Sequence, residues 1–304
     1  MAAANFKIGK RLEERIFAWG MALPAIIALI ILSIYPFFTA LQSSFYKVDT
    51  ITREQTFIGL DNYLWVIQSD LFWASLKRSL VWTFSGVSIQ LLLGLVFSLV
   101  LHQELKGRNA ARGLVLFPYL IPAVVAAIMW RFMLSPTLGV INYLLIDVFN
   151  LMKTPFTWLA RPDTAMWGVI LVGVWKYTPF MIILFLGRLQ TVPTELYEAA
   201  KIDGANSLQL FLYITLPWLT PIIMVALMLR TIWLFNHFDL VYLMAFGGPM
   251  EATTTVPVLI HRAAFSDLRI GRAATISMFM VAILMVSTIL YTLAYSKSEE
   301  QLSN

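Results

Sequence analysis

The chain has 304 residues, of which 59% are hydrophobic, 13% are charged and none is cysteine. Soluble domains average about 45–50% apolar and about 25% charged residues, so a soluble fold of this length has too little interior for this composition. These numbers exclude a soluble enzyme, a disordered chain, a disulfide-framed module and thiol or Cys–zinc chemistry. The net charge of +5 is interpreted as membrane topology and contact with anionic lipid.

Six stretches are long and apolar enough to cross a bilayer, which takes about 20 residues. The first has a basic start, but its apolar part is too long for a signal peptide, so we expect a retained span. Prolines inside several stretches are compatible with spanning helices, because neighbouring helices can satisfy the freed carbonyls. The expected spans are Ile16–Leu41, Leu80–Leu101, Gly113–Leu134, Met166–Leu186, Trp218–Phe238 and Ala273–Tyr295.

An even number of spans places both termini on one side of the membrane. The two sides carry similar numbers of Lys and Arg, but those on the terminal side lie in shorter loops, where the positive-inside rule applies. We therefore expect both termini to be cytoplasmic. The expected parts are an N-terminal tail with the first span and first outward loop (residues 1–78), a five-span core (79–295) and a C-terminal tail (296–304).

Ionisable residues at membrane depth are costly and usually face a cavity or a partner. Arg131, near the end of the third span, is interpreted as reaching the membrane interface. Lys176 and Tyr177 lie near the middle of the fourth span, and Arg230 lies in the fifth. A structural or inter-subunit role is favoured for these three, although Lys176 and Tyr177 are kept as candidates for a substrate path.

The inward loop between the fourth and fifth spans, residues 187–217, predicts a helix–turn–helix. Pro193 suits a first helical position, and Glu198 is favourable toward the positive end of the helix dipole. Gly204 follows a run of strong helix formers, where a left-handed C-terminal residue is expected. Asn206 or Ser207 can then cap a second short helix, which is expected to end before the fifth span.

This loop resembles the EAA signature of the membrane subunits of binding-protein-dependent ABC importers. The match is Glu198-Ala199-Ala200, three residues, Gly204, nine residues, Ile214, one residue and Leu216-Pro217. Other segments resemble the sugar-importing branch, the maltose- and glycerol-phosphate-type permeases. They are Gly59-Leu60-Asp61-Asn62-Tyr63, Pro118 to Pro122, Ser135-Pro136 with Gly139 and Asn142, Trp175 with Pro179-Phe180, and Gly247-Gly248-Pro249 before Thr253-Thr254-Thr255.

The resemblance runs from about Leu23 to Tyr295 and implies an all-α polytopic protein with six transmembrane helices in the type I ABC importer permease fold. It also implies that the inward hairpin plugs into a groove on a separate ATPase. The alternatives are a well-capped connector, or a DNA-binding helix-turn-helix, for which the loop has too few basic residues. The expected coupling residues are Glu198, Ala199, Ala200, Asp203, Gly204 and Pro217.

Arg230, Trp233 and His237 have i, i+3, i+7 spacing, which predicts one face of the fifth span. Aromatic rings can stack on a sugar, while amide and carboxylate groups bind its hydroxyls, and in the family this region resembles the stretch that lines the translocation path. The alternative is bonding between neighbouring helices. His237 beside Asp239 is interpreted as a packing pair rather than a proton relay. The candidate path residues are Trp233, Asn236, Asp239, Tyr242, Lys176 and Tyr177.

We therefore expect a permease subunit of an ATP-driven sugar importer in a bacterial inner membrane, with no enzymatic activity. No G-x-x-x-x-G-K-[ST] phosphate loop occurs, so any ATPase must be another polypeptide. The implied partners are a second similar permease subunit, two ATPase copies, an outer solute-binding protein and the sugar. An ion-driven secondary transporter, a permease for glycerol phosphate and a membrane enzyme are the alternatives. No catalytic residue, cofactor or metal site is expected, since His102, His237 and His261 are scattered.

Overall fold

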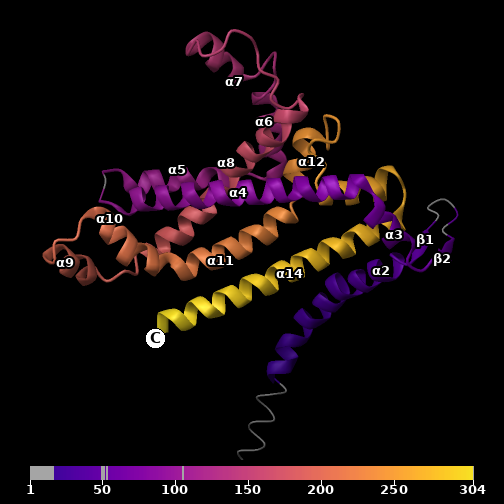
Figure 1. Cartoon of the computed structure of the whole chain (residues 1–304), viewed down its shortest axis with the longest axis horizontal. Helices are drawn as coiled ribbons and strands as arrows, with labels where there is room; N and C mark the ends of the chain where they lie inside the picture. The colour runs from indigo at the N-terminus through magenta and orange to yellow at the C-terminus, as the bar shows by residue number, and fades with distance from the viewer. Residues whose placement is uncertain (1–16, 49–51, 53, 105, 304) are drawn as a thin grey trace, which may run out of the picture. The chain divides into compact units, whose positions relative to one another are not determined.

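The computed structural model describes residues 17–48, 52, 54–104 and 106–303, with side chains up to residue 293. The expected N-terminal tail and the first residue of the first span, Ile16, lie outside the described residues. The chain forms two compact units. Unit 1 comprises residues 1–68 and 263–279, and unit 2 comprises residues 69–262 and 280–304. Their helices and strands are labelled in Figure 1. The boundaries expected from the sequence, after residues 78 and 295, stay predictions.

Unit 1 contains the first span, a short hairpin and a short helix. The span runs over Phe17–Ser43, and none of its most apolar window is buried within the chain. The hairpin is antiparallel, with Tyr46 opposite Phe57. The elements are η1 (Ile30–Ile34), α2 (Tyr35–Ser43), β1 (Tyr46–Val48), β2 (Gln55–Phe57), α3 (Asp61–Gln68) and the start of α14 (Ile270–Ser303).

Unit 2 is a helical bundle built around α8 (Pro162–Leu189), which contacts α4, α5, α6, α11 and α12. Most of the apolar window of α8 is buried, which explains its near-continuous apolar sequence. The other elements are α4 (Asp70–His102), α5 (Arg108–Leu120), α6 (Ala123–Met133), α7 (Val140–Tyr143), η2 (Leu144–Val148), α9 (Thr194–Ile202), α10 (Ser207–Leu210), η3 (Phe211–Thr215), α11 (Leu216–Phe235), α12 (Asp239–Ala245) and α13 (Val256–His261); η4 (Arg262–Ser266) follows α13 at the boundary with unit 1.

Five described helices are long and apolar enough to cross a membrane, and a bent pair provides a sixth candidate. The expected third span over Gly113–Leu134 corresponds to the bent pair, in which α5 and α6 meet at an angle of 94°. Pro122 has no N–H to donate to the carbonyl of Pro118, and Ile121 between them is extended, with ψ 131°. The two prolines therefore break the span in its middle.

The fifth expected span also differs from the structure. One continuous helical segment runs over Ser207–Phe235 through α10, η3 and α11. The expected separate second helix of the inward loop is therefore wrong, because Leu216-Pro217 lies inside this segment. Pro217 has no N–H to donate within this segment, and the turn before it, η3, is a π-helix in which the N–H of Leu216 donates to the carbonyl of Phe211.

Small residues allow close packing in the core of unit 2. The indole Nε1 of Trp82 in α4 donates a hydrogen bond of 2.9 Å to the carbonyl of Leu234 in α11. Its ring lies against Gly173 of α8, where a Cβ atom would be 2.4 Å from Cη2. Without a hydrophobic drive between helices in lipid, such close contacts stabilise the bundle.

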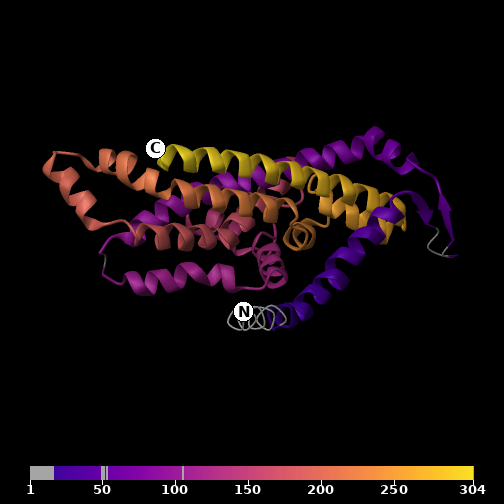
Figure 2. The same cartoon turned by 90° about the horizontal axis from the view of Figure 1, so that it is seen from below.

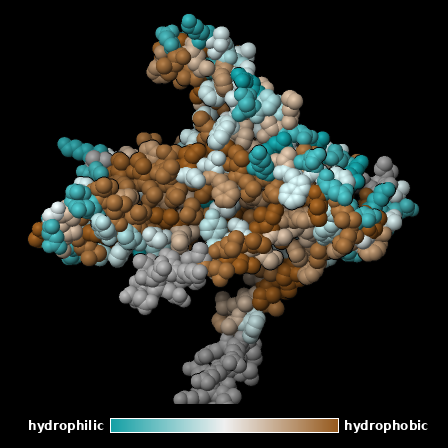
Figure 3. Space-filling model, in the orientation of Figure 1, coloured by the Kyte–Doolittle hydropathy of each residue, from teal (hydrophilic) through white to brown (hydrophobic). Residues whose placement is uncertain are grey.

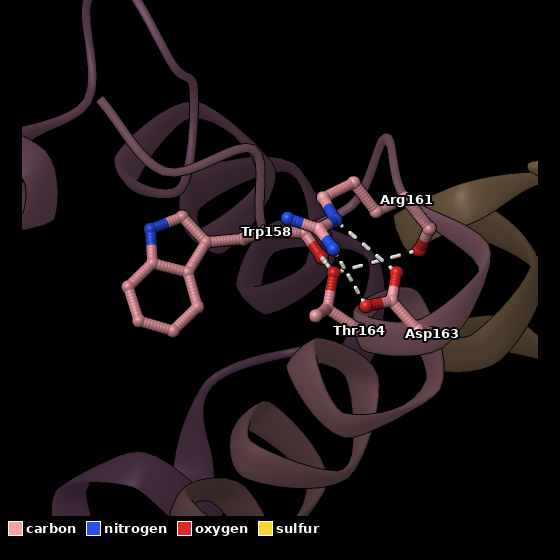
Figure 4. A network of polar contacts seen from close by, with 4 residues as sticks. All are labelled: Trp158, Arg161, Asp163 and Thr164. Carbon is pink, nitrogen blue, oxygen red and sulfur yellow. Dashed lines mark hydrogen bonds and ion pairs between the residues drawn. The ribbon is translucent and has the colours of Figure 1, made fainter. Parts of the chain in front are cut away.

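The N-terminal end of α8 makes local polar contacts (Figure 4). Arg161 donates to both carboxylate oxygens of Asp163, at 3.2 and 2.9 Å. The hydroxyl of Thr164 donates to the carbonyl of Trp158 at 3.1 Å. These bonds hold the chain where the preceding loop enters the helix.

The face of unit 2 formed by α4 and α5 is strongly apolar (Figure 3). Exposed large side chains on these helices are Leu92, Val96, Leu114, Phe117 and Leu120. An apolar surface of this extent is typical of contact with lipid or with another membrane helix.

Candidate functional site

The hairpin between α8 and α11, residues 193–217, lies at one end of unit 2 in both views of the chain (Figures 1 and 2). Pro193 is the residue before α9 rather than its first helical residue, with ψ 132°. No residue of α9 is buried. Glu198 and Ala199 are exposed and Ala200 is half-buried, so the first helix presents most of its surface outward.

The turn between the two helices has the geometry that the sequence predicts. Asp203 ends α9, and Gly204 adopts the left-handed conformation with φ +84°. The N–H of Ala205 then donates to the carbonyl of Ala200 at 2.9 Å, which satisfies a terminal carbonyl of α9. Asn206 begins the next helix with a capping box that includes Gln209.

The hairpin is tied to both spans at its base. The Nε of Arg188, at the end of α8, donates to the carbonyl of Trp218 at 3.1 Å, and its guanidinium lies 4.9 Å from that indole. The indole of Trp218 donates to the hydroxyl of Thr191 at 3.1 Å. Within the hairpin, the hydroxyls of Tyr197 and Thr215 lie 2.9 Å apart. A force on the exposed helix is therefore transmitted to α8 and α11 together.

The hairpin also leaves large apolar side chains exposed. Ile202 is 86% exposed and Tyr213 is 77% exposed. Leu196 and Leu208 add to this surface. Such a surface is typical of contact with another protein or with the membrane.

A polar cluster lies in the middle of unit 2, around Arg230 of α11. This side chain is only 2% exposed, and its Nε donates to Oε1 of Gln90 in α4 at 3.0 Å. The guanidinium lies over three rings, at 4.8 Å from Tyr177, 5.7 Å from Phe180 and 6.0 Å from Trp233. Cation–π contacts compensate in part for the lost hydration of the buried charge.

Lys176 has a structural contact at the break between α5 and α6. Its ammonium group donates to the carbonyl of Ile121 and lies 3.5 Å from the carbonyl of Pro118. These are the carbonyls that the broken helix leaves without backbone donors, so Lys176 replaces the missing N–H groups. These contacts favour a structural role for Lys176, as the sequence does. They do not favour a role in the substrate path.

The expected continuous stripe on the fifth span is wrong, because α11 ends at Phe235 and α12 begins at Asp239. The Leu234 carbonyl receives hydrogen bonds from the Trp82 indole and from the His237 N–H, so it is not available to continue the helix. The His237 ring bonds the hydroxyl of Tyr177 at 2.8 Å rather than pairing with Asp239.

The candidate path residues divide into two groups around this break. Trp233 is 43% exposed at the edge of the Arg230 cluster, and Asn236 and Asp239 are exposed at the break. Tyr242 packs with Phe238, Phe246 and His261, with ring centroids 4.7–5.2 Å apart. Tyr177 is buried and connects the Arg230 cluster to His237.

The sequence did not predict that Gln90, Trp82 and Phe180 contact the polar residues of α11 or its end. Gln90 is an amide inside an otherwise apolar stretch of the second span, which was the available signal. Trp82 is 1% exposed and donates a hydrogen bond to α11, a contact that its position in an apolar stretch does not indicate. Among the described residues, no group of three His, Asp or Glu side chains can hold a metal ion.

Comparisons with known proteins agree with this architecture. Residues 90–299 match the family described as "Binding-protein-dependent transport system inner membrane component". The trehalose/maltose transport system permease protein MalF of Thermococcus litoralis is 38% identical over 86% of this chain and 88% of its own length. The inner membrane ABC transporter permease protein YcjO of Escherichia coli is 33% identical over 88% of this chain and 90% of its own length.

Solved structures of ABC transporter subunits also share the fold of this chain. A chain of a bacterial ABC transporter involved in the import of the acidic polysaccharide alginate has a TM-score of 0.82 and 25% identity, with 96% of this chain and 99% of that chain covered. A chain of the MetNI methionine ABC transporter shares the fold, with a TM-score of 0.51 and 18% identity over 78% of this chain and 96% of that chain.

Proposed function

This chain belongs to the family of binding-protein-dependent transport system inner membrane components, and from that premise we propose that it is one membrane subunit of an ATP-driven sugar importer. It is a multi-pass membrane protein of the ABC permease class. In the proposed complex, a second similar permease completes the pathway, two ATPase copies bind on the cytoplasmic side, and a solute-binding protein delivers the sugar from outside. The complex is placed in a bacterial inner membrane, and the chain itself catalyses no reaction.

The observation that carries this proposal is the exposed hairpin of residues 193–217. The first helix of this hairpin has no buried residue, yet its ends are capped and its base is bonded to α8 and α11. A free surface loop needs no such anchoring. A rigid helical hairpin that is anchored to two spans is suited to transmitting a conformational change of a cytoplasmic ATPase to the helices of unit 2.

The same two spans carry three of the candidate path residues, and the others follow the end of α11. Tyr177 lies on α8, Trp233 lies on α11, and His237 bonds Tyr177 where α11 ends. We propose that movement of the hairpin shifts α8 and α11 and so opens or closes the path beside Trp233, Asn236 and Asp239. Alternating access then needs no chemistry in this chain.

A sugar as substrate is supported by the relatives and by the exposed side chains. The trehalose transport system permease protein SugA of Mycobacterium tuberculosis is 32% identical over 90% of this chain and 87% of its own length. An indole, an amide and a carboxylate at the break between α11 and α12 provide a stacking surface and groups that bind hydroxyls.

The absence of cysteine allows a direct test by site-specific cross-linking. In membranes that contain the whole importer, Ala199→Cys on α9 should cross-link to the ATPase subunit through a short bifunctional maleimide that also reacts with a cysteine placed in that subunit. Thr137→Cys, exposed in the loop beyond α6, is the matched control and should form no such product.

A membrane-impermeant maleimide applied to intact cells completes the test. It should label the Thr137→Cys variant, whereas the Ala199→Cys variant should react only after the membrane is opened. Labelling of Ala199→Cys from outside, or equal cross-linking of both variants to the ATPase, would contradict the proposed coupling.

A further inference from the structure

Unit 1 contains a cavity of about 540 Å³ that the transport function leaves without a role. Its walls come from β1, the start of α3 and the turn that leads into α14. Three cations and one carboxylate line it. They are Lys47, Arg269, Arg272 and Asp267. Three positive charges minus one negative charge give the lining a net charge of +2.

In the described part of unit 1, no ion pair within 4.0 Å joins the three cations of this cavity to a carboxylate, and the single carboxylate of the lining leaves it net positive. The guanidinium of Arg272 lies 4.1 Å from the ring centroid of Trp65, which holds its position without removing its charge. The cavity is therefore complementary to an anion.

The walls of the cavity are fixed in advance by buried bonds. Asn62, only 5% exposed, donates to the carbonyls of Ser44 at 2.9 Å and Tyr46 at 3.1 Å. The hydroxyl of Thr275 also donates to the Ser44 carbonyl, at 3.2 Å. Gly271 lets α14 approach β1 closely, since a Cβ there would lie 2.1 Å from the Tyr46 carbonyl oxygen. These contacts hold together the backbone segments that carry the cations.

The cavity lies at the level where two spans meet the membrane surface. The first span ends at Ser43 and the last candidate span begins at Ile270, and the lining residues follow or precede these ends directly. Lipid phosphates lie at this depth, and Tyr and Trp are enriched there. Tyr46 lines the cavity and Trp65 supports Arg272, as expected at such an interface.

The helix beside the cavity has the pattern of an interfacial helix. Leu60, Leu64 and Ile67 follow i, i+4, i+7 spacing and are 60%, 54% and 50% exposed. On the opposite face, Asn62 and Val66 are buried. An apolar stripe left open on a helix at the membrane surface is suited to the boundary between head groups and acyl chains.

We propose that this cavity binds the phosphate of an anionic phospholipid of the phosphatidylglycerol type. In the proposed topology the cavity faces outward, where the positive-inside rule disfavours Lys and Arg, so a local anion gives this cluster a role. A lipid with a net negative charge matches the lining, whereas a zwitterionic lipid brings a cation of its own. The lipid fixes the outer end of α14 against β1 and α3.

The test uses the full-length chain, purified with the subunits that accompany it and placed in nanodiscs of mixed phosphatidylglycerol and phosphatidylcholine. The variant Lys47→Gln/Arg269→Gln removes two cations and keeps Arg272 on Trp65. The control Lys77→Gln/Lys153→Gln removes two exposed cations on the same side, outside the cavity. Native mass spectrometry counts the phosphatidylglycerol that each protein retains.

We expect the wild type and the control to retain phosphatidylglycerol, and retention by the cavity variant to fall roughly tenfold or more. In neutral detergent the cavity variant should melt at the wild-type temperature, and added phosphatidylglycerol should stabilise only the wild type and the control. Equal retention by all three proteins would overturn the proposal. Complete displacement of the lipid by free glycerol phosphate would also overturn it in favour of a soluble anion, and a selective loss of affinity for the solute-binding protein would overturn it in favour of a protein contact.

Discussion

Single residues set the distances between the helices of unit 2. Gly173 and Gly187 lie on the same helix, α8, but in different surroundings. At Gly173 the ring of Trp82 occupies the position of a side chain, whereas at Gly187 no atom lies within 4 Å of a Cβ position. Alanine substitutions at these two glycines therefore separate the effect of packing from the effect of helix propensity.

We predict that Gly173→Ala destabilises the protein by about 1–3 kcal/mol, because Trp82 is held by its bond to Leu234 and cannot move aside. Gly187→Ala should be neutral or stabilising by up to about 1 kcal/mol, since alanine is the better helix former. Thermal unfolding of the purified protein, followed by tryptophan fluorescence, measures both. Equal melting temperatures for the two variants would contradict the packing of Trp82 on Gly173.

The buried cations of unit 2 have different roles. Lys176 donates hydrogen bonds to backbone carbonyls at the break between α5 and α6. Arg230 connects α4, α8 and α11 through Gln90 and Tyr177. We predict that Lys176→Met leaves buried carbonyls without donors and costs about 1–3 kcal/mol. Lys153→Met, in an exposed loop, is the control and should melt like the wild type.

A melting temperature of Lys176→Met that equals the wild-type value would show that the break does not depend on the lysine. In that case Lys176 would return to the candidates for the substrate path. Uptake measured on the same variants separates these roles, since a purely structural lysine changes the amount of folded protein and leaves the apparent KM unchanged.

At the scale of elements, composition and apolar runs predicted the helices well but not their breaks. The third span has the right length and hydropathy, yet Pro118 and Pro122 act together with Lys176, which lies far along the chain. The end of α11 likewise depends on Trp82, which is remote in sequence. Such breaks arise from tertiary contacts, so local patterns cannot predict them.

The hairpin behaves differently, because its geometry is local. Gly204, the cap at Asn206 and the end of α9 all follow from residues within one turn of each other, and the sequence predicted them. Gly107, before α5, has the same φ of +84° and the same open surroundings, so it serves as a matched control.

We predict that Gly204→Ala and Gly107→Ala each cost about 1 kcal/mol, because both residues would hold a left-handed conformation. Only Gly204→Ala should reduce substrate-stimulated ATP hydrolysis by the reconstituted importer, since it disturbs the joint between the two helices of the hairpin. A comparison of ATPase rates at equal amounts of assembled complex makes the test. Equal coupling in the two variants would contradict the role of the hairpin.

At the level of the whole molecule, the proposed function divides transport between this membrane subunit and a separate ATPase. The sequence has no phosphate loop, and the family to which the chain belongs works with a separate binding protein. The sequence predicted this function because the signature in residues 198–217 is contiguous. It did not predict the Arg230 cluster, whose members come from three helices.

We predict that sugar uptake into liposomes containing the assembled importer requires ATP on the side of the hairpin and the external solute-binding protein. A protonophore or a sodium ionophore should leave the uptake rate unchanged, because no ion gradient drives the cycle. The control is an importer in which the phosphate-loop lysine of the ATPase subunit is replaced, and it should show no uptake. Uptake by that control that stops when the ion gradient collapses would identify a secondary transporter, since only an ion-driven mechanism moves substrate without ATP hydrolysis.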